Sequence, residues 1–225
     1  MIELKNNQLI FRFPEVHPKA VGQIDFMKTL RIPDDVRQYP LPAGIGSFHL
    51  EHIEDHVKRV PEHWRSRGGV LLPMHQSEAM WINFSGDYPM AIKIATGKIN
   101  AITGEAWTNE LSDEPQDYVV LSEQPWLDGY AIERGTVRQF VAAQLGKNVT
   151  VEEQVTGEAE FGGIQIIAFP MKEEVYREYF ESPRGLVLDC IEEVLYSEEC
   201  YSDALEMGIA PGGMIRQEIY EDEYG

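Results

Sequence analysis

The sequence predicts an α+β protein that is predominantly antiparallel β, with its strands packed as a sandwich or a barrel. Short runs of β-branched and aromatic residues recur between turn residues from Leu9 to Phe169. After Pro170 the pattern changes to acidic stretches with helical spacing. We expect a single domain over residues 1–225. The alternative is a sub-boundary near residue 170, between a β-rich body (1–170) and an acidic helical flank with a final strand (171–225).

Strands are indicated by apolar alternation bounded by glycine, proline and polar residues. Two pairs of strands flank good hairpin turns, Thr96-Gly97-Lys98 and Glu133-Arg134-Gly135-Thr136. The expected strands cover residues 9–13, 22–32, 70–72, 80–84, 91–95, 99–102, 118–121, 131–132, 137–141, 149–156 and 164–169.

A short helix is predicted in the N-terminal half, from about Leu50 to Val60. Apolar residues recur there at helical spacing, and Pro61 ends the pattern. In the C-terminal part we predict helices at residues 173–181 and 186–206, with Gly208 as a natural stop. A final strand is expected after the Gly-Gly turn at residues 212–213.

The charge of the chain argues against two classes of partner. The formal net charge is −19, from 38 acidic and 19 basic residues. From residue 173 onward there are 15 acidic and 3 basic residues, so the excess is concentrated in the C-terminal part. Such a surface repels phosphate backbones and anionic lipids, so we expect no nucleic-acid partner and no membrane partner. We expect the acidic flank to serve either solubility or the docking of a basic partner or of cations.

Cysteine usage and hydropathy predict a cytoplasmic protein. The chain has only two cysteines, Cys190 and Cys200, which do not make a disulfide framework. Its first residues contain no apolar signal-peptide core. No apolar run approaches the roughly 20 residues that a transmembrane helix needs, so we expect no membrane span.

Common catalytic and nucleotide-binding motifs are missing from the sequence. We find no P-loop, no dinucleotide-binding glycine pattern, no nucleophile elbow and no H-E-x-x-H pair. No cofactor can therefore be named, and the question of enzymatic activity stays open.

Three histidines lie within eight residues, at His49, His52 and His56. On a helix His52 and His56 would share one face, at a spacing that can chelate a transition metal. The simpler interpretation is that they are surface histidines, because the apolar residues 50, 53 and 57 define the buried face.

Most unusual residues of the chain fall between Met74 and Gln139. A lining of aromatic, amide and charged side chains would suit a polar small molecule or a sugar. The alternative is that the tryptophans fill the core and the charges pair on the surface. The candidate ligand-binding residues are Trp81, Lys93, Trp107, Asp117, Trp126, Asp128 and Arg138.

Two of these candidates are cations inside predicted strands, Lys93 and Arg138. Each has apolar neighbours along the strand. A cation that points inward needs a carboxylate partner, and Asp117 and Asp128 are the candidates.

Several stretches resemble a family of bacterial proteins to which no activity is assigned. They are LRIPDDVRQYPLPAGIG, PQDYVVLSEQPWLDG, VRQFVA, VTVEEQVTGE and GGMIRQEIY, with QPWLDG the most distinctive. The similarity runs from about residue 30 to residue 170, with a separate match near the C-terminus. It implies a shared fold and carries over no functional residue.

The leading hypothesis is a non-catalytic β-rich protein that binds a ligand or assembles with itself. The second is an enzyme that acts on a polar small molecule through Lys93, Asp117, Asp128 and Arg138. The third is a metal-binding protein that uses His52 and His56. A deep pocket with buried, paired charges would favour the second.

Overall fold

The computed structural model describes residues 2–181, 201–202, 207–217, 219–220 and 222, and the fold is stated for these. The described strands are β1 (Ile2–Lys5), β2 (Gln8–Arg12), β3 (Val21–Thr29), β4 (Gln38–Tyr39), β5 (Gly44–Ser47), β6 (Glu51–His52), β7 (Val70–Leu71), β8 (Ala79–Ser85), β9 (Met90–Thr96), β10 (Ile99–Asn100), β11 (Val119–Leu121), β12 (Trp126–Leu127), β13 (Gly129–Glu133), β14 (Thr136–Gln144), β15 (Ile164–Pro170), β16 (Tyr201–Ser202) and β17 (Met207–Ile215). The helices are η1 (Ile53–His56), α1 (Glu62–Arg67), α2 (Val151–Thr156), α3 (Glu173–Tyr176) and η2 (Arg177–Glu181).

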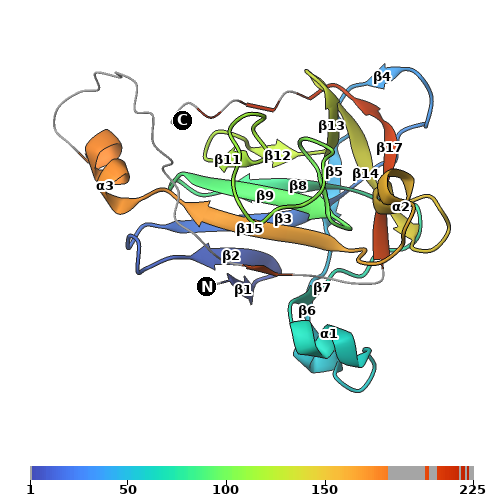
Figure 1. Ribbon diagram of the computed structural model, residues 1–225, viewed down its shortest axis with the longest axis horizontal. Helices are drawn as coiled ribbons and strands as arrows, with labels where there is room; N and C mark the ends of the chain where they lie inside the picture. Colours follow the sequence, from blue (N-terminus) through green and yellow to red (C-terminus); the bar gives the residue numbers. More distant parts are fainter. Residues whose placement is uncertain (1, 182–200, 203–206, 218, 221, 223–225) are drawn as a thin grey trace.

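The described strands form two large sheets and one short pair (Figure 1). The larger sheet follows the order β1-β2-β3-β8-β14-β17-β4, and β5, β12 and β13 pair with β3, β8 and β14. The second sheet follows β10-β9-β15-β16, with β11 beside β9. Its β9–β15 pair is antiparallel in register from Ile164↔Thr96 to Pro170↔Met90. The predominantly antiparallel α+β class is thus confirmed.

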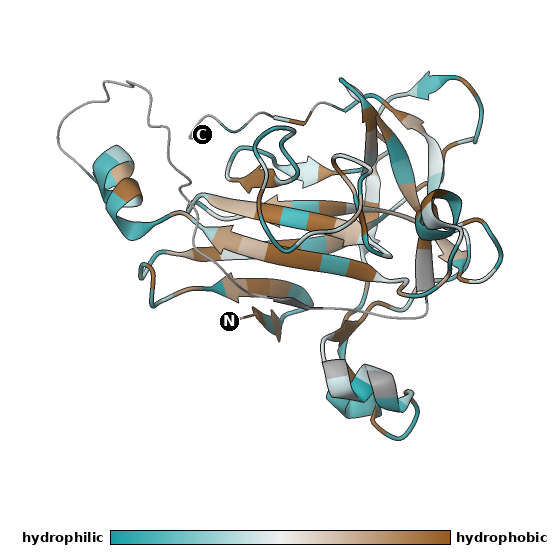
Figure 2. Cartoon of the chain, in the orientation of Figure 1, coloured by the Kyte–Doolittle hydropathy of each residue, from teal (hydrophilic) through white to brown (hydrophobic). Residues whose placement is uncertain are grey.

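Both large sheets contribute to one hydrophobic core. The larger sheet supplies Ile24 and Ile82, and the second supplies Ile92 and Ile166. Strand β9 is buried along its whole length, which indicates that both of its faces are covered. Figure 2 shows that β9 and β15 are mostly hydrophobic, with short hydrophilic interruptions.

Both predicted hairpins are present. Strand β9 pairs with β10 across residues 97–98, and β13 pairs with β14 across residues 134–135. The final strand is present as β17, but it extends through the Gly-Gly pair instead of beginning after it. It pairs with β14 from Gln144↔Met207 to Val137↔Ile215. A strand from beyond residue 170 therefore lies inside the sheet that earlier residues build.

The predicted helix from Leu50 to Val60 is wrong in extent. Its residues form all of β6, the short 3₁₀ helix η1 and a turn, while α1 begins after Pro61. Leu50 and Ile53 are buried, but Val57 is exposed. Only half of the expected apolar face is therefore covered by protein, and a longer helix has nothing to pack against.

The predicted strand at residues 149–156 is a helix, α2, preceded by Thr150 as its N-cap. The Thr150 hydroxyl accepts a hydrogen bond from the backbone N–H of Glu153, and the Glu153 carboxylate accepts one from the Thr150 backbone. This reciprocal capping box outweighs the β-propensity of the valines and threonines nearby.

The predicted helix at residues 173–181 is present as α3 followed by η2. The predicted helix at 186–206 lies outside the described residues, apart from Tyr201 and Ser202, which form β16. In the part of the chain that the structure describes, no helix combines the length and the apolar character needed to cross a bilayer.

Candidate functional site

Lys93 projects from the middle of β9 and is fully buried. Its ammonium group donates hydrogen bonds to Asp117 Oδ2 at 2.6 Å, to Thr108 Oγ1 at 3.0 Å and to the carbonyl oxygen of Glu110. The ring of Trp107 lies 5.3 Å from Nζ, at a cation–π distance. The carboxylate partner that a buried lysine requires is therefore Asp117, one of the two predicted candidates.

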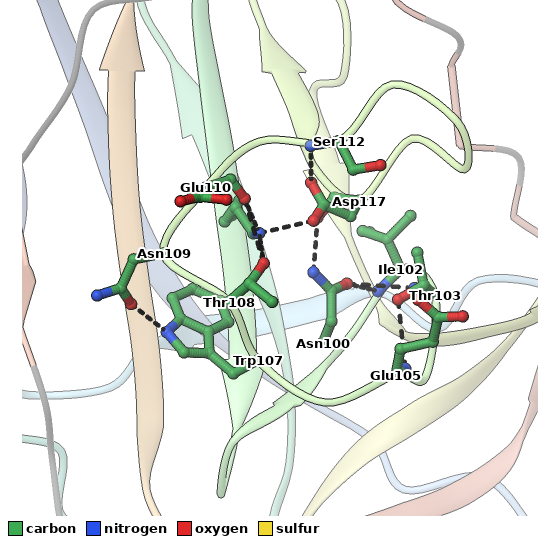
Figure 3. A network of polar contacts seen from close by, with 11 residues as sticks. Asn100, Ile102, Thr103, Glu105, Trp107, Thr108, Asn109, Glu110, Ser112 and Asp117 are labelled. Carbon is green, nitrogen blue, oxygen red and sulfur yellow. Dashed lines mark hydrogen bonds and ion pairs between the residues drawn. The ribbon is translucent and has the colours of Figure 1, made fainter.

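The network around Asp117 fixes the loop that follows β10 (Figure 3). Asp117 Oδ1 accepts a hydrogen bond from the backbone N–H of Ser112 at 3.1 Å. Asn100 donates to the backbone oxygen of Asp117 at 2.7 Å and accepts from the backbone N–H groups of Ile102 and Thr103. The buried ion pair therefore anchors residues 101–117 on the outer face of β9.

Three other predicted residues, Trp81, Trp126 and Asp128, lie together on the larger sheet. The rings of Trp81 and Trp126 meet edge to face, with centroids 6.5 Å apart. Leu127 is buried in the main core, so its neighbours Trp126 and Asp128 face the other side of the sheet. The pairing of Trp126 with Asn83 and of Leu127 with Ile82, continued by one residue, brings Asp128 opposite Trp81.

Asp128 lies where β8 changes its neighbour from β12 to β14. We call this position the fork. Asp128 is only 1% exposed. Neither its Oδ2 atom nor Trp81 Nε1 has a hydrogen-bond partner among the described residues. Burial raises the pKa of the Asp128 carboxyl to about 7, against the lowering effect of a side-chain hydrogen bond with Trp126.

Arg138 belongs to neither group. It is exposed on β14, where it pairs in register with Tyr130 and Met214. The seven predicted residues therefore form two separate groups on different sheets, with Arg138 apart. The four charged residues of the enzyme hypothesis do not share one pocket.

The two predicted metal ligands do not share a helix face. His52 is exposed in β6, and His56 ends η1, where its Nε2 contacts a carboxylate oxygen of Glu51. No group of three or more histidine, cysteine or acidic side chains among the described residues is arranged to hold a metal ion. Metal binding at His52 and His56 remains a prediction.

A cavity of about 340 Å³ lies between three segments of the chain. One wall is the loop fixed by Lys93 and Asp117, a second is the β13–β14 hairpin, and the third is the segment after β17. Its lining residues are Ile102, Thr103, Gln116, Ala131, Ile132, Glu133, Arg134, Gly135, Thr136, Gln217, Ile219 and Tyr220. None of the seven residues predicted from the sequence is among them.

The cavity is joined to the fork through Gln217. The Gln217 amide accepts from the backbone N–H of Asp128 at 2.8 Å and donates to the carbonyl oxygen of Trp126 at 3.0 Å. Its own backbone N–H donates to the carbonyl oxygen of Gly135 at 3.1 Å. One residue of the C-terminal segment thus ties β12 to the β13–β14 turn. The GGMIRQEIY stretch was the sequence signal nearest to this feature.

Comparison of the chain with protein-family models, with curated proteins and with solved structures finds no match. The resemblance to a bacterial family stays a prediction.

Proposed function

We propose that the protein is a non-catalytic binding protein that takes a small polar molecule into the cavity between the Lys93-anchored loop, the β13–β14 hairpin and the C-terminal segment. The observation that carries this proposal is the cavity itself. Its volume of about 340 Å³ falls at the lower end of the range for small-molecule sites. We place the protein in the cytoplasm, in line with its few cysteines.

Two threonine hydroxyls indicate the chemistry of the ligand. Thr136 Oγ1 accepts a hydrogen bond from Gln38 Nε2 at 2.9 Å, and Thr103 Oγ1 accepts one from the backbone N–H of Glu105 at 3.2 Å. Each hydroxyl can also donate one hydrogen bond, and no acceptor for that bond is found among the described residues. A ligand rich in oxygen acceptors would satisfy both.

Apolar and charged groups complete the lining. Ile102, Ile132 and Ile219 offer hydrophobic contact, while Glu133 and Arg134 add charges of both signs. Such a lining suits a small oxygen-rich molecule that also has an apolar face. It does not favour a polyanion, since the chain as a whole carries a net charge of −19.

A binding role is favoured over catalysis by the position of the buried charges. Lys93 is enclosed and bonded to three partners, and Asp117 accepts bonds through both of its carboxylate oxygens. Neither side chain lines the cavity. Lys93 and Asp117 instead have a structural role, because they hold in place the loop that carries Thr103.

Native mass spectrometry of the protein purified from its own source tests the proposal. A non-peptide mass of a few hundred daltons is expected on each chain, and it should be lost in the double variant Thr103→Val/Thr136→Val, which keeps the side-chain shape. Ser85→Ala, which removes an exposed hydroxyl from the end of β8, is the control. If the added mass persisted in the double variant, the ligand would not lie in this cavity.

A further inference from the structure

The last residue pair of the β13–β14 hairpin before its turn lies at the cavity. Glu133 and Thr136 are paired in register, so their side chains lie on the same face of the hairpin, with β-carbons about 5 Å apart. Both residues line the cavity. A ligand group bound by one of them is therefore within reach of the other.

The two side chains offer complementary chemistry. Thr136 is 3% exposed, and its oxygen already accepts a hydrogen bond from Gln38, so its hydroxyl is left to donate. Glu133 is exposed, and its carboxylate has no hydrogen bond and no ion pair among the described residues. A ligand that satisfies both needs an acceptor oxygen and a positive charge on neighbouring groups.

We propose that the cavity binds a free α-amino acid with a large apolar side chain, an inference that rests on the proposed function. In such a molecule one carbon atom carries both the ammonium and the carboxylate, so the two groups are close enough together to meet Glu133 and Thr136 at once. The ammonium pairs with the Glu133 carboxylate, and a carboxylate oxygen of the ligand accepts from the Thr136 hydroxyl. Both contacts are charge-assisted hydrogen bonds, which are stronger than neutral ones.

Two further lining residues suit the carboxylate of the ligand. Arg134 has an interaction within the chain, but its guanidinium has five N–H donors and can bind a carboxylate as well. Thr103 adds a second hydroxyl from the opposite wall. Among the described lining residues Glu133 is the one acid and Arg134 the one base, so a zwitterion compensates the charges of the lining.

The apolar part of the lining suits the side chain of the amino acid. Ile102 and Ile219 line the cavity and pack against the main hydrophobic core. Tyr220, which is 50% exposed, adds an aromatic ring. A large apolar side chain would cover this surface and remove it from water, which supplies affinity beyond that of the polar contacts.

Isothermal titration calorimetry of the dialysed full chain tests the proposal. The ligands are L-tryptophan, L-phenylalanine and L-leucine, together with indole-3-propionate, which lacks the amino group of tryptophan, and tryptamine, which lacks its carboxylate. At least one of the amino acids is expected to bind. For tryptophan, each truncated analogue should bind roughly tenfold or more weakly, because one charge-assisted hydrogen bond is lost. Failure of all three amino acids to bind, or equal binding of tryptophan and its analogues, would overturn the proposal.

A variant at Glu133 shows which group the carboxylate recognises. Glu133→Gln should weaken the binding of the amino acid roughly tenfold. It should not weaken the binding of indole-3-propionate, because that ligand has no ammonium and its own carboxylate is repelled by Glu133. Glu15→Gln, which changes an exposed acid that does not line the cavity, is the control and should alter neither. Equal weakening of both ligands by Glu133→Gln would refute the role of Glu133.

The outcomes also separate this inference from the proposed function. A purified protein may bind none of the three amino acids and still carry a non-peptide mass that is lost in Thr103→Val/Thr136→Val. That result would overturn the amino-acid assignment alone, and the cavity would remain a binding site. Absence of both the amino-acid binding and the added mass would overturn the two proposals together.

Discussion

The Nζ atom of Lys93 lies 2.6 Å from Oδ2 of Asp117, and the lysine side chain has no exposed surface. A charge in that position cannot be compensated by water if its partner is removed. The stability of the whole loop that follows β10 therefore depends on this pair.

Asp117→Asn should destabilise the protein by about 3–5 kcal/mol, because it leaves the Lys93 charge buried and unpaired. The free energy of unfolding in urea measures the effect. The control is Arg177→Met, which breaks the exposed pair between Arg177 and Glu173 and should cost less than about 1 kcal/mol. Equal effects of the two substitutions would contradict the assignment of Lys93 and Asp117 as a structural anchor.

Asp128→Asn should stabilise the protein at neutral pH. The pKa of Asp128 is about 7 in the folded state and 3.8 for the free side chain, so the folded state holds a proton that the unfolded state has released. The wild-type free energy of unfolding should therefore fall as pH rises from about 4 to about 7 and then level off. The advantage of the variant should grow over the same window, to a few kcal/mol at most. Urea denaturation at several pH values measures it, and parallel pH profiles for the two proteins would show that Asp128 is not a buried acid.

Thr150→Ala should reduce the free energy of unfolding by about 1 kcal/mol, since it removes the hydroxyl that caps α2. Thr150→Ser keeps the hydroxyl and should stay close to the wild type. Thermal unfolding followed by circular dichroism distinguishes them. If alanine and serine behaved alike at this position, the capping box would not be what holds α2.

Gly129→Ala should prevent folding. A β-carbon at Gly129 would lie 1.8 Å from the carbonyl oxygen of Arg138, so β13 and β14 could not stay paired. The control is Gly135→Ala in the turn of the same hairpin, where φ is +78° and no atom lies within 4 Å of the added carbon. It should cost only about 1–2 kcal/mol of backbone strain. The yield of folded protein measures both, and a normal yield of the Gly129 variant would refute the close approach.

The environment of Lys93 could be predicted because its signal is local. A lysine between isoleucines in a strand either lies on the solvent-exposed face of the sheet or pairs with an acidic residue. Asp117 was one of the two acidic partners predicted for it. The grouping of Trp81 with Trp126 and Asp128 could not be predicted. It depends on which strand lies beside β8, and no spacing along the chain encodes that choice.

The cavity was missed for a related reason. Gln116 and Gln217, which line it, lie in irregular segments or at their borders, where there is no hydrophobic period to interpret. Their amides act through contacts with residues far away in the chain. The error at α2 was of a different kind, because the T-x-x-E pattern at residues 150–153 is a helix signal in the sequence, and the strand prediction considered only the neighbouring β-branched residues.

The bonds from Gln217 to Trp126 and Asp128 join positions 91 and 89 residues apart. During synthesis, a chain that has reached only residue 200 already contains β8, β12 and β14 but still leaves the backbone groups at the fork without these partners. Closure of the fork is therefore a late event on the ribosome, and contacts of such long range also slow folding. Until residue 217 has emerged, the two tryptophans and the acid beside them lack contacts that they have in the complete protein.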